Sequence, residues 1–213
     1  MSESQQHQFA TPLPAGLGAL GIACFGLFAL FSGKCTHEAA PILTAWFLGG
    51  FVVQLVTAYI EFRDKSVAGG NVFLVFACFF MLTGAVSLTS KYFLGAAKMP
   101  LDLGVEAWLW LPAGLWLAIM LPCFLKSPSV LFILGVFVEL IVISLIALDF
   151  KFAPAFFVNL AVWSSLISGV LAIYLSGALA MNATFGKTVL YVGSPLAGGS
   201  PAPVPAVAGA SKG

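Results

Sequence analysis

Long uninterrupted runs of apolar residues dominate the hydropathy pattern of this chain. A helix needs about 20 such residues to cross roughly 30 Å of hydrocarbon. The runs that reach this length cover Leu13 to Phe31, Pro41 to Phe62, Asn71 to Ser90, Ala107 to Leu125, Val130 to Leu148 and Pro154 to Ala180. Strands of a β-barrel would instead alternate apolar and polar residues over about ten positions. The pattern therefore predicts an all-α membrane protein, a bundle of six transmembrane helices.

Composition supports this fold class and sets the domain limits. Of 213 residues, 61% are hydrophobic and only 8% are charged, which is too few to give a soluble domain a polar shell. The loops are short, so we expect one transmembrane transport domain over residues 11–192. A polar N-terminal tail (residues 1–10) precedes it, and a disordered Pro/Ala/Gly tail (residues 193–213) follows. Residues 1–10 carry no Lys or Arg, so we expect the first helix to be retained rather than cleaved as a signal peptide.

The basic residues predict the orientation of the chain in the membrane. An even number of spans places both termini on one side of the membrane. That side would hold Arg63, Lys65, Lys126, Lys187 and Lys212, and the other side Lys34, Lys91, Lys98 and Lys151. The small excess on the first side favours cytoplasmic termini. The compact size and minimal loops favour a prokaryotic inner membrane.

Cysteine and histidine usage argues against metal, redox and haem chemistry. The four cysteines lie in separate segments without C-x-x-C spacing, and both histidines lie outside the predicted spans. We therefore expect no cofactor, no bound metal, no enzymatic activity and no nucleic-acid partner. Few ionisable groups and scattered small polar residues suit the passage of a small solute better than catalysis.

Polar residues within the spans are the candidates for function. Gln54, Thr57 and Glu61 are spaced to form one stripe on the second helix, which should face protein or water rather than lipid. Interhelical hydrogen bonding and pore lining explain this stripe equally well. Glu139 lies near the middle of the fifth span, where a charged carboxylate costs about 2.5–3.5 kcal/mol on insertion scales. It is either a neutral group bonded to a neighbouring helix or a proton carrier coupled to transport.

Two helix starts are rich in glycine and proline. The first is "TPLPAGLGALG" (residues 11–21), and the second is "GGNVF" (residues 69–73), where Gly69 and Gly70 are expected to form a turn and Asn71 to cap the third helix. Free N–H groups at such starts would make an anion site without Lys or Arg. The alternative, which spacing alone favours, is that both are simple helix starts with loop glycines.

Taken in order, these motifs resemble the acetate uptake transporter family, in particular its bacterial succinate-acetate permease branch. Residues 11–17, Thr-Pro-Leu-Pro-Ala-Gly-Leu, stand where relatives carry Asn-Pro-Ala-Pro-Leu-Gly-Leu. Gly50, Gln54 and Glu61 match the second helix, and residues 70–73 match Gly-Asn-Thr-Phe. The last helix and its "FGKTVL" ending complete a resemblance that spans about residues 11–193.

The resemblance implies a six-helix protomer, assembled in relatives as a hexameric ring with one path through each subunit. The expected partners are acetate, in some members succinate, a lipid bilayer and, in a symporter, protons. It also implies an apolar constriction at Leu20, Met81 and Val138, with Thr11 and Asn71 as polar contacts beside it. An apolar neck would dehydrate a two-carbon acid and exclude a hydrated inorganic ion.

Three questions stay open at this point. The chain departs from the family pattern at Thr11 and at Met81, where relatives commonly carry an aromatic residue, and a flexible thioether in the neck could admit somewhat different cargo. Channel conduction and proton-coupled transport are both compatible with the motifs. A membrane scaffold or sensor that transports nothing is the alternative function, and acetate flux through purified protein would distinguish the two.

Overall fold

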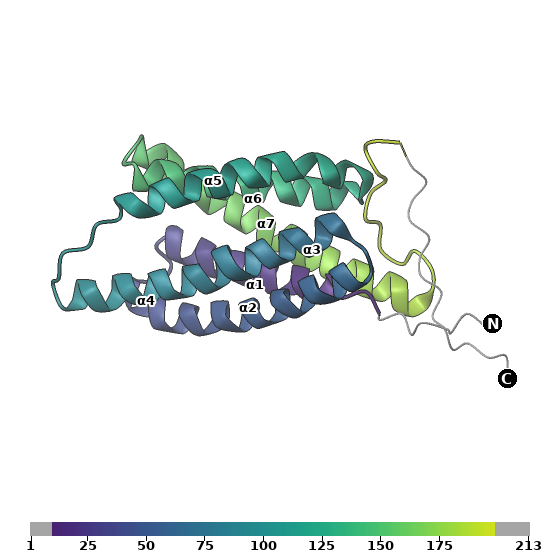
Figure 1. The fold of residues 1–213 in the computed structure, drawn as a ribbon, viewed down its shortest axis with the longest axis horizontal. Coiled ribbons are helices and arrows are strands. Elements are labelled where there is room, and N and C mark those ends of the chain that lie inside the picture. Colours follow the sequence, from purple (N-terminus) through teal and green to yellow (C-terminus); the bar gives the residue numbers. More distant parts are fainter. Residues whose placement is uncertain (1–9, 199–213) are drawn as a thin grey trace.

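The computed structural model describes residues 10–198, and the chain in this range is helical, without strands (Figure 1). Its helices are α1 (Leu13–Phe31), α2 (Ala40–Arg63), α3 (Val67–Val75), α4 (Thr83–Ala96), α5 (Gly104–Met120), α6 (Ser129–Asp149) and α7 (Pro154–Phe185). Short segments η1 (His37–Ala39) and η3 (Leu121–Lys126) are 3-10 helices, and η2 (Phe76–Leu82) is a π-helix. Because α3, η2 and α4 are continuous, the described chain has six helices long and apolar enough to cross a membrane, and the predicted fold class is confirmed.

The third span begins earlier than the sequence predicts. Helix α3 starts at Val67, so the expected turn at Gly69 and Gly70 and the expected cap at Asn71 are wrong. The Asn71 side chain instead donates from Nδ2 to the carbonyl oxygen of Val67, 2.8 Å away. The glycines serve close packing, because a Cβ at Gly70 would lie 2.5 Å from the ring of Phe62 on α2.

Small residues allow α1 to pack closely along α7, and α6 covers the neighbouring face of α7. A Cβ at Gly21 would lie 2.7 Å from Cγ1 of Ile173 and 3.2 Å from the carbonyl oxygen of Gly169. Near the start of α1, the hydroxyl of Ser176 donates to the carbonyl oxygen of Pro14 at 2.6 Å. Such close helix approach through Gly and Ser is the usual packing mode in membranes.

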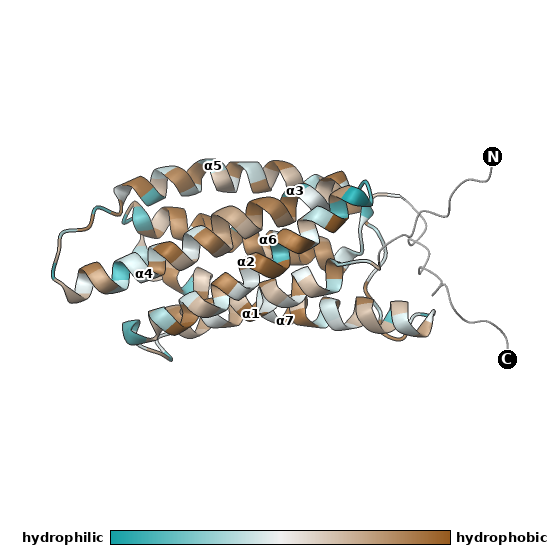
Figure 2. Cartoon of the chain, turned by 60° about the horizontal axis from the view of Figure 1, so that its bottom comes forward, coloured by the Kyte–Doolittle hydropathy of each residue, from teal (hydrophilic) through white to brown (hydrophobic). Residues whose placement is uncertain are grey.

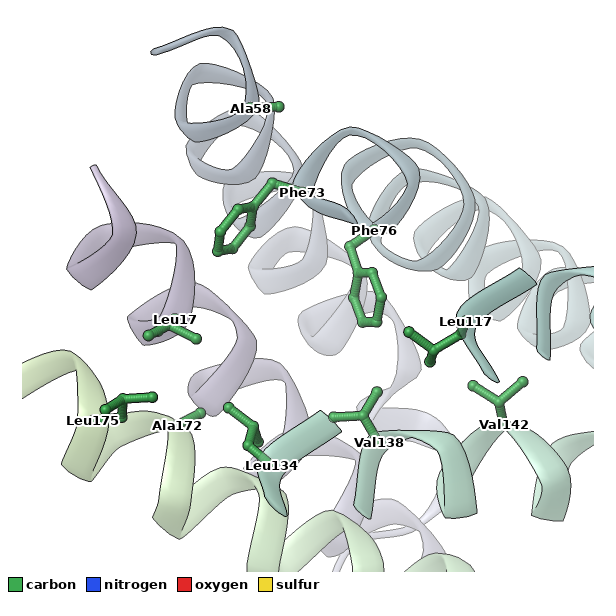
Figure 3. Packing of buried hydrophobic residues seen from close by; sticks show 10 residues of the cluster. All are labelled: Leu17, Ala58, Phe73, Phe76, Leu117, Leu134, Val138, Val142, Ala172 and Leu175. Atoms are coloured by element: carbon green, nitrogen blue, oxygen red, sulfur yellow. The ribbon is translucent and has the colours of Figure 1, made fainter. Parts of the chain in front are cut away.

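The bundle has an apolar centre and an apolar outer surface. Figure 3 shows the central cluster, to which α1, α2, α3, η2, α5, α6 and α7 all contribute: Leu17, Ala58, Phe73, Phe76, Leu117, Leu134, Val138, Val142, Ala172 and Leu175. Most positions along the middle of the helices are hydrophobic, and the hydrophilic ones gather mostly toward the ends (Figure 2). Trp46, Tyr59 and Trp163 are each at least 60% exposed. This surface suits a lipid bilayer.

The spans alternate in direction, so α1 begins and α7 ends at the same end of the bundle (Figure 1). We call this the terminal end, and the end at which α4 ends and α5 begins the opposite end. After α7 the chain folds back over the terminal end. Asn182 accepts the N–H groups of Val189 and Leu190, at 2.6 and 2.9 Å, and donates to the carbonyl oxygen of Leu190 at 2.8 Å.

The folded-back segment also reaches the start of α6. The N–H of Val130 donates to the carbonyl oxygen of Val192, and the N–H groups of Leu196 and Ala197 both donate to the carbonyl oxygen of Leu125. Leu196 and Ala197, which lie in the expected disordered tail, are thus bonded to the bundle. Residues 199–213 and residues 1–9 of the expected N-terminal tail lie outside the described residues.

Candidate solute pathway

Two cavities lie between α1, the third span, α5 and α6. Cavity 1, of about 150 Å³, extends toward the opposite end, where Phe31 and Asp149 line it. Cavity 2, of about 160 Å³, extends toward the terminal end, where Glu61 and Ser127 line it. Both cavities share Leu20, Phe76 and Val138, and we call these three residues the neck. The cavities therefore follow one another along the bundle axis, with an apolar boundary between them.

The neck is built from three separate elements. Leu20 comes from α1, Phe76 from η2 and Val138 from α6, and the latter two side chains are about 5% exposed. Figure 3 shows the Phe76 ring directed toward Leu117 and Val138. This ring stacks on Phe80 with centroids 4.3 Å apart and planes 9° apart, and Phe80 in turn contacts Trp110. Since all three rings line cavity 1, its wall beside the neck is aromatic.

Met81, the residue expected from the third span, lines cavity 1 but not cavity 2. Its side chain packs toward α2, where a Cβ at Gly50 would lie 3.1 Å from the sulfur. Phe76 holds the place between the cavities instead. The π-helix shifts the register of the residues that follow Phe76, and the hydroxyl of Thr83 donates to the carbonyl oxygen of Cys78 at 3.0 Å within this distorted region. Sequence reasoning missed Phe76, which no local signal separates from the nearby phenylalanines.

The polar stripe of α2 is buried in the protein. Gln54, Thr57 and Glu61 are 0%, 1% and 9% exposed. Thr57 donates to the carbonyl oxygen of Val53 at 2.9 Å, within its own helix. Gln54 and Glu61 line cavity 2, and neither polar atom of the Gln54 amide has a hydrogen-bond partner among the described residues. Gln54 thus lines cavity 2 with a buried amide that bonds to no other described residue.

The start of α1 does not offer the free N–H groups that an anion site would need. The N–H of Leu13 donates to Oγ1 of Thr11 at 3.4 Å, and the N–H groups of Ala15 and Gly16 donate to the carbonyl oxygen of Pro12. The interpretation as a simple helix start is therefore the one that agrees with the structure. Thr11 lies exposed at this start and lines neither cavity.

Asn71 and Glu139 also lie away from the two cavities. Asn71 is held by its bond to its own helix, as described above. Glu139 follows the neck residue Val138 on α6 but is directed to α5, where its Oε1 would lie 3.6 Å from a Cβ at Gly114. Its Oε2 is buried, and no group among residues 10–198 hydrogen-bonds to it. A bond to a neighbouring helix, one of the two alternatives for Glu139, is therefore not formed through this oxygen.

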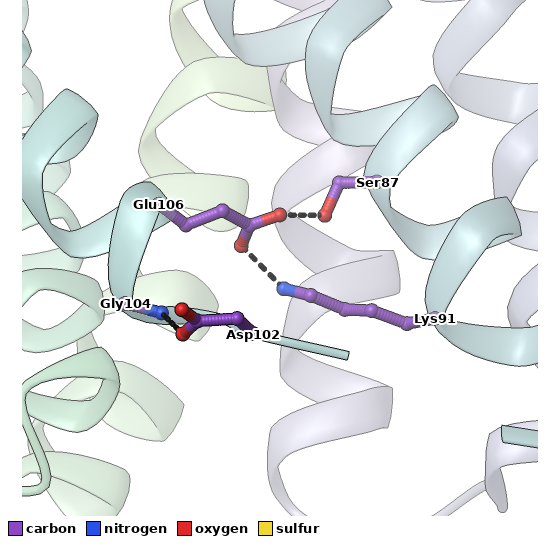
Figure 4. Close-up of polar contacts among 5 residues, drawn as sticks. All are labelled: Ser87, Lys91, Asp102, Gly104 and Glu106. Carbon is purple, nitrogen blue, oxygen red and sulfur yellow. Dashed lines mark hydrogen bonds and ion pairs between the residues drawn. The ribbon is translucent and has the colours of Figure 1, made fainter. Parts of the chain in front are cut away.

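A cluster of charged side chains lies at the mouth of cavity 1, and sequence reasoning did not single it out. Figure 4 shows Lys91 of α4 in an ion pair with Glu106 of α5, and Asp149 of α6 lines the same cavity. The only sequence signal was the position of these residues near the ends of predicted spans. Nowhere in the described part of the chain do three or more His, Cys, Asp or Glu side chains form a metal-binding group.

Comparison with known proteins identifies relatives that are similar to this chain in sequence and in fold. No family model matches the chain. It is 29% identical over 187 residues to the succinate-acetate/proton symporter SatP of Escherichia coli K12, and equally to that of Shigella flexneri; the alignments cover 87% of this chain and 96% of each relative. Among solved structures it is similar to the bacterial acetate channel SatP, with a TM-score of 0.76 and 25% identity over 87% of this chain and 99% of that one.

These relatives are described as transport proteins rather than enzymes, which agrees with the expectation that this chain has no enzymatic activity. The likeness covers nearly the full length of each relative and includes the six-span fold. The chain is therefore a homologue of the SatP succinate-acetate symporters and shares the fold of the SatP acetate channel, as the order of its sequence motifs predicted.

Proposed function

We propose that this chain transports acetate and related short carboxylates, succinate among them, across a lipid bilayer. The path within each protomer consists of cavity 1, the neck and cavity 2. The substrates named for the SatP relatives support this cargo. The observation that carries the path is that two cavities, extending toward opposite ends of the bundle, share three apolar residues.

The dimensions and chemistry of the path suit a short organic acid. An apolar protein cavity of about 150 Å³ can hold a molecule as large as benzene, so each cavity has room for a small carboxylic acid. The neck offers no polar group to replace the hydration of an inorganic ion. A methyl or methylene group, in contrast, is favourably placed between Leu20, Phe76 and Val138.

Gln54 is the polar contact that we assign to the substrate in cavity 2. Its buried amide carries two N–H donors and one acceptor, and none of them is used by the described protein. Donation from Nε2 would hold a carboxylate just beyond the neck, with Glu61 nearer the terminal end. A buried polar group without a partner is costly, so an amide kept in this state is favoured where a passing solute supplies the missing partner.

The assembly is inferred from the resemblance, the orientation from the distribution of basic residues, and the membrane from the compact size and short loops. We propose a homohexameric ring in which every protomer has its own path, in a prokaryotic inner membrane with both termini in the cytoplasm. The continuous apolar outer faces support burial against lipid or other copies of the chain. Native mass spectrometry of the detergent-extracted protein measures the copy number, and a monomer there would contradict the ring.

The transport proposal is tested with radiolabelled acetate and liposomes that contain only the purified protein. We expect saturable or conductive uptake, and Val138→Phe should remove most of it because the added ring enters the neck. Ile143→Phe is the matched control on the same helix, since Ile143 is 39% exposed on the outer surface. Liposomes that stay impermeable to acetate would favour the scaffold or sensor function.

The same liposomes separate the two transport modes. With an imposed pH gradient and no acetate gradient, a proton symporter accumulates acetate, whereas a channel for the anion responds to membrane potential instead. Permeation of the undissociated acid through lipid is subtracted with protein-free liposomes.

Normal uptake by Val138→Phe would show that the neck is not on the path.

A further inference from the structure

The mouth of cavity 1 contains a carboxylate that is held in the same way as a substrate carboxylate would be. Oε2 of Glu106 lies 2.5 Å from Nζ of Lys91, and Oε1 of Glu106 accepts a hydrogen bond from the hydroxyl of Ser87. Figure 4 shows the two contacts on the two oxygens of one carboxylate. One ammonium and one hydroxyl thus form a two-point carboxylate site, and a side chain of the protein occupies it.

The site opens to the proposed path. Ser87, Lys91 and Glu106 all line cavity 1, and Lys91 is the sole basic side chain among the described residues that line either cavity. The Lys91 and Glu106 side chains are 36% and 23% exposed, so both can be reached from the mouth while partly shielded from water. Deeper in the cavity the lining is apolar, including the rings of Phe80 and Trp110.

The charges at the mouth do not otherwise favour an entering anion. Asp149 from α6 lines the same cavity and interacts electrostatically with both Lys91 and Glu106. With all groups ionised, two carboxylates and one ammonium leave one negative charge at the mouth. A free carboxylate is therefore attracted only at Lys91, and only when Glu106 gives up its place.

We propose that Lys91 and Ser87 form the loading site for the substrate carboxylate, and that Glu106 is an internal competitor for it. This inference depends on the proposed transport function. The ligand class is a short monocarboxylate, whose charged end takes the place of the Glu106 carboxylate. Its alkyl end then lies against the aromatic wall and points toward the neck. The exchange is non-covalent, because one carboxylate replaces another on the same ammonium and hydroxyl.

The competitor model makes an unusual prediction, which is that removal of an acidic side chain improves substrate loading. Glu106→Gln keeps the size and shape of the side chain but binds the ammonium less strongly. We expect the KM for acetate uptake to fall by about two- to fivefold, which corresponds to the weight of one partly exposed ion pair. A variant that is merely misfolded cannot produce this gain.

Two further variants complete the experiment. Lys91→Met removes the one basic side chain among the described residues that line either cavity, and this loss of a ligand contact should raise KM several-fold. Asp102→Asn is the matched control, because Asp102 lies just before α5 and accepts the N–H of Gly104 at 2.8 Å without lining cavity 1. This control should keep the KM of the unmodified chain.

The outcomes distinguish this inference from the transport function itself. No acetate uptake by the unmodified chain would contradict the proposed function. Normal uptake with an unchanged or raised KM in Glu106→Gln would overturn the competitor model and leave transport intact. An equal fall in KM for Asp102→Asn would also overturn it, because the effect would then be a general consequence of removing surface charge.

Discussion

Replacement of Gln54 by leucine should raise stability and lower transport together. Gln54 is fully buried, and both polar atoms of its amide lack partners among the described residues. A buried polar group without a hydrogen bond costs about 1–3 kcal/mol. Leucine has a similar size and no such cost, so Gln54→Leu should increase the free energy of unfolding by about 1–3 kcal/mol. For a chain of this length that corresponds to roughly 2–12 °C in Tm.

The opposite effect is expected on function, because the substitution removes the donor that we assign to the substrate carboxylate in cavity 2. The assay is a pair of measurements on the same preparation: thermal unfolding in detergent, and acetate uptake in liposomes. We expect a higher Tm and an uptake that needs more acetate to reach half its maximum. The combination is informative because a general packing defect lowers both quantities.

Asn182 supplies the matched control, since it is another buried amide at 7% exposure. It makes three hydrogen bonds, to the backbone at Val189 and Leu190. At about 0.5–1.5 kcal/mol for each bond, Asn182→Leu should lower stability. If Gln54→Leu also lowers Tm, the amide has a structural partner and our account of cavity 2 is wrong. Unchanged acetate affinity would refute the substrate contact separately.

Two further substitutions test the positions of Glu139 and of the first helix. Glu139 faces α5 and lines neither cavity, so Glu139→Gln should leave the acetate flux into liposomes and its pH dependence unchanged. A pH profile that becomes flat in this variant would instead support Glu139 as a proton carrier. Gly16→Ala should lower stability by about 1–3 kcal/mol, because the new Cβ would lie 2.5 Å from the ring of Phe73. Gly49→Ala, where no atom lies within 4 Å of the new Cβ, is its control in thermal unfolding, and equal Tm values for the two would contradict the packing argument.

The sequence predicts the spans well because a membrane-spanning helix needs only a sufficiently long run of apolar residues. A run of about 20 apolar residues crosses the bilayer whatever its neighbours are. Boundaries are less certain, because packing decides them: Gly69 and Gly70 have the composition of a turn, yet they lie inside α3 where it packs against α2. The π-helix is also invisible in the sequence, since "FACFFML" is apolar throughout and suits an ordinary helix equally well.

Leu20 and Val138 of the neck were expected from the family resemblance. From residue patterns alone, the candidate site was predictable only where one helix determined it. The spacing of Gln54 and Glu61 is a property of α2 alone, and both side chains line cavity 2 as one face of that helix. Phe76 replaces Met81 in the neck, and the π-helix that begins at Phe76 shifts the register of Met81. Lys91 and Glu106 are 15 residues apart, and their side chains meet across the mouth of cavity 1 because α5 runs back along the bundle after α4, which no local pattern encodes. Features that depend on how separate helices are rotated and paired must come from the structure.

The segment that follows α7 sets a practical limit on how the chain can be modified. Its backbone supplies a hydrogen-bond acceptor for Val130 at the beginning of α6 and two donors for Leu125. A reporter protein fused directly after Gly186 would delete these contacts and also leave Asn182 without its backbone partners. Fusion after Gly198 retains them all, so a fluorescent label for measuring expression or sidedness belongs beyond that residue.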